Sequence, residues 1–93
     1  MPVRGPYGFD LGDNYPNPFN PSTTIDVGLT TSGVMSLKIY DVLGQLVKVV
    51  DEGYRDRGEY TYDVNMNDFA SGIYFYTLRQ GADSMTRKMI LIR

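Results

Sequence analysis

The segment from Asn14 to Pro21 restricts the fold of this chain more than any other. It holds three prolines in six residues, at positions 16, 18 and 21. Each proline ring fixes its own φ, lacks an amide hydrogen and biases the preceding residue towards extended geometry. We therefore expect a stiff, ordered ribbon, not a helix or a central strand. Its asparagines can bond nearby backbone groups in place of ladder bonds, and Tyr15 and Phe19 can anchor it through their apolar rings.

The rest of the chain alternates apolar and polar side chains over short segments separated by turn residues such as Gly44. This pattern predicts strands over residues 24–29, 35–40, 46–50, 59–64, 73–78 and 85–92, with a short edge strand at residues 9–11. No segment has a helical period. We therefore predict an all-β fold, an antiparallel immunoglobulin-like β-sandwich of about seven short strands.

Three details of this sandwich can be checked directly. The strand 46–50 is expected to end before residues 51–53, and the charged residues 54–58 are expected to form the turn that follows. Residues 73–78 are apolar at nearly every position, which favours a central strand covered on both faces. The predicted core comprises the apolar residues on the inward faces: Ile25, Val27, Leu29, Leu37, Ile39, Val47, Val49, Tyr62, Tyr74, Tyr76, Leu78, Met89 and Leu91.

Composition excludes several classes of function. The chain has no cysteine and no histidine, which rules out disulfides, thiolate metal sites and the commonest acid–base group. A net charge of −2 gives no reason to expect nucleic acid or an anionic membrane as a partner. No apolar run approaches the roughly 20 residues that span a bilayer. We predict a domain that is not an enzyme, with no catalytic residue, no cofactor, no metal and no membrane-spanning segment.

One stretch imitates a calcium site. Residues 63–67 have the D-x-N-x-N spacing with which a calcium loop begins, where alternate oxygens converge on the ion. The remaining positions do not fit, because Asp68 stands in place of the glycine and Tyr74 in place of the bidentate glutamate. We interpret the stretch as a polar corner between strands.

Four blocks of sequence, in order, resemble one known family. They are residues 14–25, 37–45, 70–78 and 88–93. Together they resemble the C-terminal sorting domain, type A, of the type IX (Por) secretion system of Bacteroidetes-type bacteria. Two positions depart from the family pattern, Tyr62 where tryptophan is frequent and Arg93 where lysine is commoner. The sorting-motif residues implied by the resemblance are Asn14, Tyr15, Pro16, Asn17, Pro18, Phe19, Asn20, Pro21, Tyr40, Asp41, Gly44, Ser71, Gly72, Tyr74, Lys88, Met89, Leu91 and Arg93.

The resemblance implies a function and a domain organisation. Residues 9–93 would be the sorting domain, with the immunoglobulin-like fold, and residues 1–8 a linker arm. The partners would be the outer-membrane translocon with its sorting machinery, and cargo domains fused on the N-terminal side. The domain is expected to be a monomer that passes through the periplasm and reaches the cell surface or the medium. Met1 would be an expression start, and Arg93 the natural C-terminus.

The terminal block has two expected roles. Met89 and Leu91 would dock the last strand on the core. Lys88 and Arg93, with an open backbone edge, would offer a partner unpaired amides and directed positive charge.

Two other functions stay open. The chain has eight tyrosines, and exposed aromatic rings can stack on sugars, so it could be an accessory carbohydrate-binding or spacer sandwich of a secreted hydrolase. Tyr60, Tyr62, Tyr74 and Tyr76 fall on alternating strand positions, however, which favours a packing role. A structural adhesion or assembly module is the third alternative.

Overall fold

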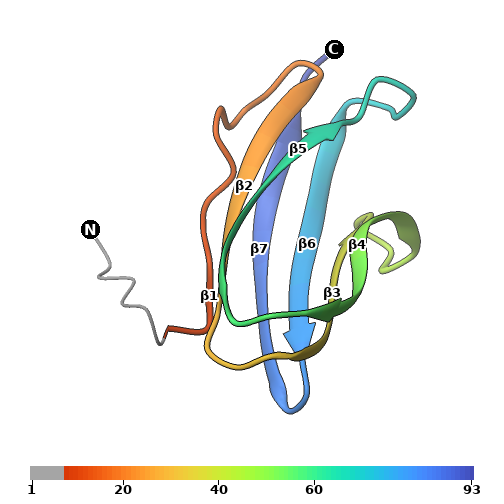
Figure 1. Ribbon diagram of the computed structural model, residues 1–93. Helices are drawn as coiled ribbons and strands as arrows, with labels where there is room; N and C mark the ends of the chain where they lie inside the picture. Colours follow the sequence, from red (N-terminus) through yellow and green to blue (C-terminus); the bar gives the residue numbers. More distant parts are fainter. Residues whose placement is uncertain (1–7) are drawn as a thin grey trace.

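The computed structural model describes residues 8–93, and strands are the regular elements of this part of the chain (Figure 1). The all-β prediction is confirmed. No helix long and apolar enough to cross a membrane occurs in residues 8–93. The strands are β1 (Asp10–Leu11), β2 (Ser22–Leu29), β3 (Gly33–Tyr40), β4 (Leu46–Arg55), β5 (Gly58–Asn65), β6 (Gly72–Gln80) and β7 (Asp83–Leu91).

These strands form two antiparallel sheets. The smaller sheet has the order β1-β2-β5, and the larger has the order β4-β3-β6-β7. The pairs β3–β4 and β6–β7 are hairpins, whereas the chain changes sheet between β2 and β3, between β4 and β5, and between β5 and β6. The apolar faces of both sheets meet in one core. The predicted immunoglobulin-like sandwich is confirmed.

The core agrees with the alternation of apolar residues on β2, β3, β6 and β7. Val47 and Tyr62 are half-buried and pack against it. Five apolar side chains outside the predicted set are also buried, namely Leu11, Phe19, Met35, Val64 and Met66. One prediction is wrong: Val49 is 45% exposed.

Val49 faces outward because β4 is irregular. Its register against β3 shifts between Leu37 and Lys38, so that Lys38 opposes Val49 and Val50 is the extra residue. Each such bulge breaks the strict two-residue alternation. Val47 and Val50 therefore pack against the core, and Val49 turns to solvent.

The predicted end of this strand at Val50 is also wrong, because β4 continues to Arg55. The charges in this stretch have partners within the fold and do not need a solvated turn. Glu52 pairs with Lys38 on the neighbouring strand at 3.1 Å, and Asp51 with Arg55. The chain reverses at residues 56–57, which lie within the predicted turn at residues 54–58.

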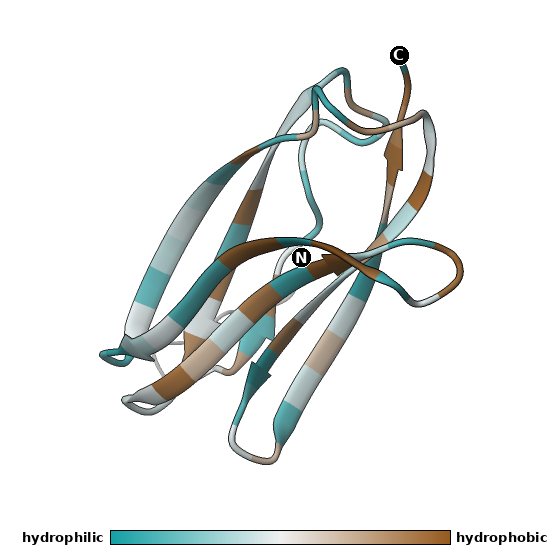
Figure 2. Ribbon diagram, turned by 90° about the vertical axis from the view of Figure 1, so that its right-hand side faces the viewer, coloured by the Kyte–Doolittle hydropathy of each residue, from teal (hydrophilic) through white to brown (hydrophobic). Residues whose placement is uncertain are grey.

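The prediction for β6 is half right. This strand is central, because it pairs with β3 on one side and β7 on the other. It is not covered on both faces, since Ile73 is 41% exposed. The domain has two layers, so the outer face of the larger sheet has no layer packed over it. Figure 2 shows hydrophobic residues in the turn that protrudes between β3 and β4, at one end of this sheet.

A matched pair of leucine substitutions tests the assignment of the core. Leu37 is fully buried and Leu43 is 80% exposed. We expect Leu37→Ala to lower the free energy of unfolding by about 2 to 5 kcal/mol, because it removes apolar contacts and leaves a cavity. Leu43→Ala should change it by less than about 0.5 kcal/mol. Urea unfolding measures both, and equal effects would contradict the described core.

Candidate functional site

The proline ribbon is folded back on the start of β2. Tyr15 and Thr24 exchange two backbone hydrogen bonds of 2.9 Å. The side-chain amide of Asn14 donates to the Thr23 hydroxyl at 3.0 Å and to the Pro16 carbonyl at 3.2 Å. The Thr23 hydroxyl in turn donates to the same Pro16 carbonyl at 2.9 Å. The peptide bonds before all three prolines are cis. Asn14 thus makes the local bonds expected of it, and the ribbon is an ordered part of the domain.

Phe19 connects the ribbon to the terminal strand. Its ring is 2% exposed and lies in the core. Its amide donates to the Ile90 carbonyl, and its carbonyl accepts from the Ile92 amide, both at 2.9 Å. The Asn17 side chain accepts from the Ile90 amide at 3.0 Å. Two segments about 70 positions apart therefore pair as a parallel bridge, and Figure 1 shows the C-terminus beside the start of β2.

Tyr15 is not the apolar anchor that its sequence position predicts. Its ring is 51% exposed, and its hydroxyl donates to Asp26 at 3.1 Å. The apolar anchoring of the ribbon comes from Phe19.

The expected open edge of the terminal block is largely closed. The ribbon occupies the backbone groups of Ile90 and Ile92. Further along β7, the Arg87 guanidinium donates to the Leu11 carbonyl and forms an ion pair with Asp13 at 3.0 Å. A partner strand could therefore not pair with this part of β7 without displacing the ribbon.

Arg93 is likewise engaged within the domain, where its guanidinium bonds to neutral backbone carbonyls. Its amide donates to the Ser71 hydroxyl at 2.9 Å. Its guanidinium donates to the carbonyls of Phe69, at 2.8 Å, and Asn67. These acceptors belong to the corner between β5 and β6, so the last residue closes that corner.

The same corner contains a tyrosine that bonds back along the chain. The hydroxyl of Tyr74, near the start of β6, donates to the Ala70 carbonyl at 2.7 Å. The Phe69 ring stands edge-on to the Tyr74 ring at 6.4 Å. This is the tyrosine corner of immunoglobulin-like sandwiches, which fixes the crossing between sheets. Ser71, Gly72 and Tyr74 therefore belong to the corner where the chain crosses between the two sheets.

The turn between β3 and β4 is built around Asp41. Its carboxylate accepts from the amides of Leu43 and Gln45, both at 2.9 Å. Gly44 has φ 82°, a left-handed conformation that suits glycine. The turn leaves Val42 and Leu43 exposed.

The structure therefore brings three of the four blocks to one end of the sandwich. The ribbon, the corner at residues 66–71 and the terminal block bond to one another there. The block around Asp41 forms a separate turn. Tyr40 is linked to the others through the sheet, because it pairs with Phe75, which pairs with Lys88.

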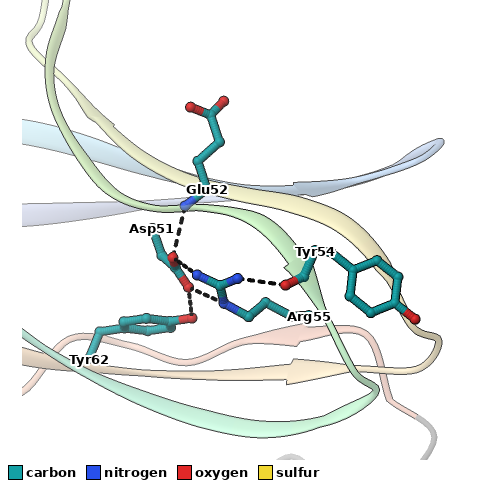
Figure 3. A network of polar contacts seen from close by, with 5 residues as sticks. All are labelled: Asp51, Glu52, Tyr54, Arg55 and Tyr62. Carbon is teal, nitrogen blue, oxygen red and sulfur yellow. Dashed lines mark hydrogen bonds and ion pairs between the residues drawn. The ribbon is translucent and has the colours of Figure 1, made fainter.

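Asp51 is the centre of a polar network that sequence reasoning missed (Figure 3). Its carboxylate accepts from the Arg55 guanidinium, the Tyr62 hydroxyl and the Glu52 amide. Tyr62 is on β5 and Asp51 on β4, so the network joins the two sheets. Asp51 and Arg55 are opposite charges four positions apart. That signal could have found the pair had the predicted strand not ended at Val50.

The network shifts the ionisation of its members. Burial alone raises the pKa of Asp51, but the hydrogen bonds from Tyr62 and Arg55, with the guanidinium charge, outweigh burial and hold the pKa below 3.8. Burial, with the hydrogen bond to Asp51, raises the pKa of Tyr62. Burial also raises the pKa of Tyr76, to about 12, and its hydroxyl donates to the Gly12 carbonyl at 2.7 Å.

The polar contacts described above join segments of the chain to one another. Within residues 8–93, no group of three or more acidic side chains could hold a metal ion. Residues 63–67, which have the spacing of the start of a calcium loop, lead into the corner described above. There the Asn65 side chain accepts from the Asn67 amide at 2.8 Å.

Comparison with known proteins agrees with this geometry. A family model described as a secretion system C-terminal sorting domain matches residues 13–92. A solved structure of PorZ, a bacterial surface component of the type IX secretion system of Porphyromonas gingivalis, is similar, with 26% sequence identity and a TM-score of 0.55. The similarity covers 87% of this chain but 11% of PorZ. None of the curated proteins matches the chain.

The lowered pKa of Asp51 predicts how stability depends on pH. Unfolding returns the carboxyl group to its ordinary pKa, so in acid the unfolded chain binds more protons than the folded one. The stability that this group contributes is present above about pH 4 and is lost as the pH falls through the lowered value. Asp51→Asn should therefore give a shallower loss of unfolding free energy between about pH 5 and pH 2.

Urea unfolding at several pH values measures this slope. Asp68→Asn, an exposed carboxylate in the corner, is the matched control and should leave the slope as it is in the original chain. Identical acid slopes for the original chain and Asp51→Asn would show that the network does not control the titration.

Proposed function

Because the chain belongs to the family of secretion system C-terminal sorting domains, we propose that it directs larger cargo domains, fused on its N-terminal side, through the outer-membrane translocon of the type IX system. The domain is a non-catalytic sorting signal, and a protein that carries it is secreted or placed on the cell surface. Any enzymatic activity would belong to the cargo. On this proposal the folded domain waits in the periplasm until the sorting machinery recognises it.

One structural observation supports this proposal. The ribbon and the terminal block bond to each other through Phe19, Ile90 and Ile92. These bonds bring the ribbon and the terminal block, which are far apart in the sequence, together on one folded surface. The export machinery would meet a folded shape and not a flexible peptide tail. On this proposal the sorting signal requires a whole folded domain of 93 residues and could not be a short terminal tag.

The terminal residues serve the fold as well as the signal. Met89 and Leu91 are buried in the core. Removing residues 90–93 would take away Leu91, both backbone partners of Phe19 and the hold of Arg93 on the corner. Such a truncation would remove the signal and unfold part of the domain together. Point substitutions of surface residues therefore separate an effect on sorting from an effect on folding better than this truncation does.

The carbohydrate-binding alternative rested on exposed tyrosines. Tyr74 and Tyr76 are buried, and Tyr60 and Tyr62 are half-buried against the core. These four rings have the packing role that their strand positions favour. These four rings therefore do not support sugar binding, and among the described tyrosines Tyr15 and Tyr54 are the ones with strongly exposed rings.

A reporter fusion tests the proposed function. The full chain is placed after a folded reporter with an inner-membrane export signal, in a host that has the type IX system. We expect the reporter on the cell surface or in the medium. The same reporter without the chain, or with an unrelated β-sandwich of similar size, should stay in the periplasm because it lacks the signal.

Protease accessibility on intact cells and fractionation locate the reporter. Retention of the full-chain fusion in the periplasm, with the sandwich shown to be folded, would contradict the sorting function. Retention together with binding of the purified chain to a polysaccharide would favour the accessory-module alternative.

A further inference from the structure

Most of the predicted sorting residues are engaged within the domain, either by hydrogen bonds or by burial in the core. Asn14 and Asp41 hold turns, Phe19, Met89 and Leu91 are buried, and Arg93 closes the corner. Tyr40 and Lys88 are different. Between residues 8 and 93 their side chains take part in no hydrogen bond or ion pair, and both lie on the outer face of the larger sheet.

The strand register places these two side chains in one row. Tyr40 lies opposite Leu46 on β4 and opposite Phe75 on β6, and Phe75 lies opposite Lys88 on β7. Directly opposed side chains in a sheet are about 5 Å apart, so the row is continuous. The next row, towards the C-terminus, pairs Ile73 with Ile90.

Together these residues form an apolar surface, which we name the outer patch: Tyr40, Leu46, Ile73, Phe75 and Ile90, with Lys88 at its rim. Leu46 is 51% exposed and Ile73 41%. The exposed Val42 and Leu43 extend the apolar surface into the protruding turn (Figure 2). Contiguous apolar surface with aromatic residues at its centre and charge at its edge is typical of protein interfaces.

We propose that the outer patch is where this domain docks on a protein of the export machinery, one that presents apolar side chains with an acidic group opposite Lys88. This inference rests on the proposed sorting function and names the surface that performs it. Residues of three of the four sequence blocks meet in the outer patch: Tyr40 from the second, Ile73 and Phe75 from the third, and Lys88 and Ile90 from the last.

Charge selects this occupant over a second copy of the chain. The outer face of the larger sheet carries three basic side chains, Lys38, Arg79 and Lys88, against one acidic side chain, Glu52. Glu52 already pairs with Lys38. Two such faces would repel each other, although the whole chain has a net charge of −2. An acidic partner would be attracted to the same face and oriented by it.

Substitutions in the reporter fusion test the apolar part of the patch. Leu46→Asp and Ile73→Asp should each lower surface delivery about tenfold, because a charge at the centre of an apolar interface is desolvated without a partner. Val34→Asp is the matched control. Val34 is 68% exposed on the same face of β3 as Tyr40, but about 20 Å away along the strand, so its delivery should be normal.

A second set of variants tests the charge. Lys88→Glu should lower delivery, whereas Lys88→Arg should preserve it, because the partner reads the positive charge. Arg79→Glu makes the same change at the other end of the same face and should be delivered normally. Exposed charges contribute little to stability, so the thermal midpoints of these variants should stay close to that of the original chain.

The outcomes separate the two proposals. If the original fusion is not delivered, the sorting function fails and the outer patch fails with it. If it is delivered and the folded Leu46→Asp, Ile73→Asp and Lys88→Glu variants are delivered equally well, the sorting function stands and the docking surface is overturned. Analytical ultracentrifugation adds a third outcome: a dimer of the purified chain that Leu46→Asp abolishes would make a second copy the occupant and overturn the proposed partner.

Discussion

The pairing of the proline ribbon with the last strand is the constraint on which the rest of this domain depends. The prolines cannot donate to a ladder, so the ribbon could not enter a regular sheet. The remaining polar groups of the ribbon find partners in two different places, Tyr15 with the start of β2 and Phe19 with the end of the chain. Because the Phe19 ring is also buried in the core, the ribbon holds the edge of both sheets at once.

The same contact solves the edge problem of a small open sandwich. An unpaired edge strand is a template for aggregation, and proteins protect it with prolines, charges, bulges or a covering segment. Here the ribbon covers the end of β7, Arg87 of β7 bonds to the Leu11 carbonyl of β1, and β4 carries two irregularities in register. With the edges of its larger sheet protected in this way, the domain can leave the outer face of that sheet exposed, and this is the face of the proposed outer patch.

Alternation of apolar residues was enough to predict the strands and most of the core, because burial on one face imposes a two-residue period. It failed at Val49 and Asp51, where bulges in β4 break that period. It also could not place Arg93 or find the partner of Phe19, since contacts between segments that are far apart in the sequence leave no local pattern. The family resemblance predicted the residues of the sorting motif, but only the structure could show which of their side chains hold the fold and which are exposed.

Amide hydrogen exchange, resolved by residue, tests the pairing of ribbon and terminal strand most directly. The amides of Phe19, Ile90 and Ile92 each donate within this contact, so they should exchange far more slowly than the same residues in an unstructured chain. Their protection should approach that of Leu37 and Leu78 in the core strands. Exchange of Phe19 and Ile92 at the unstructured rate, in a domain whose core amides are protected, would show that the ribbon and the terminal block are separate and would contradict the account.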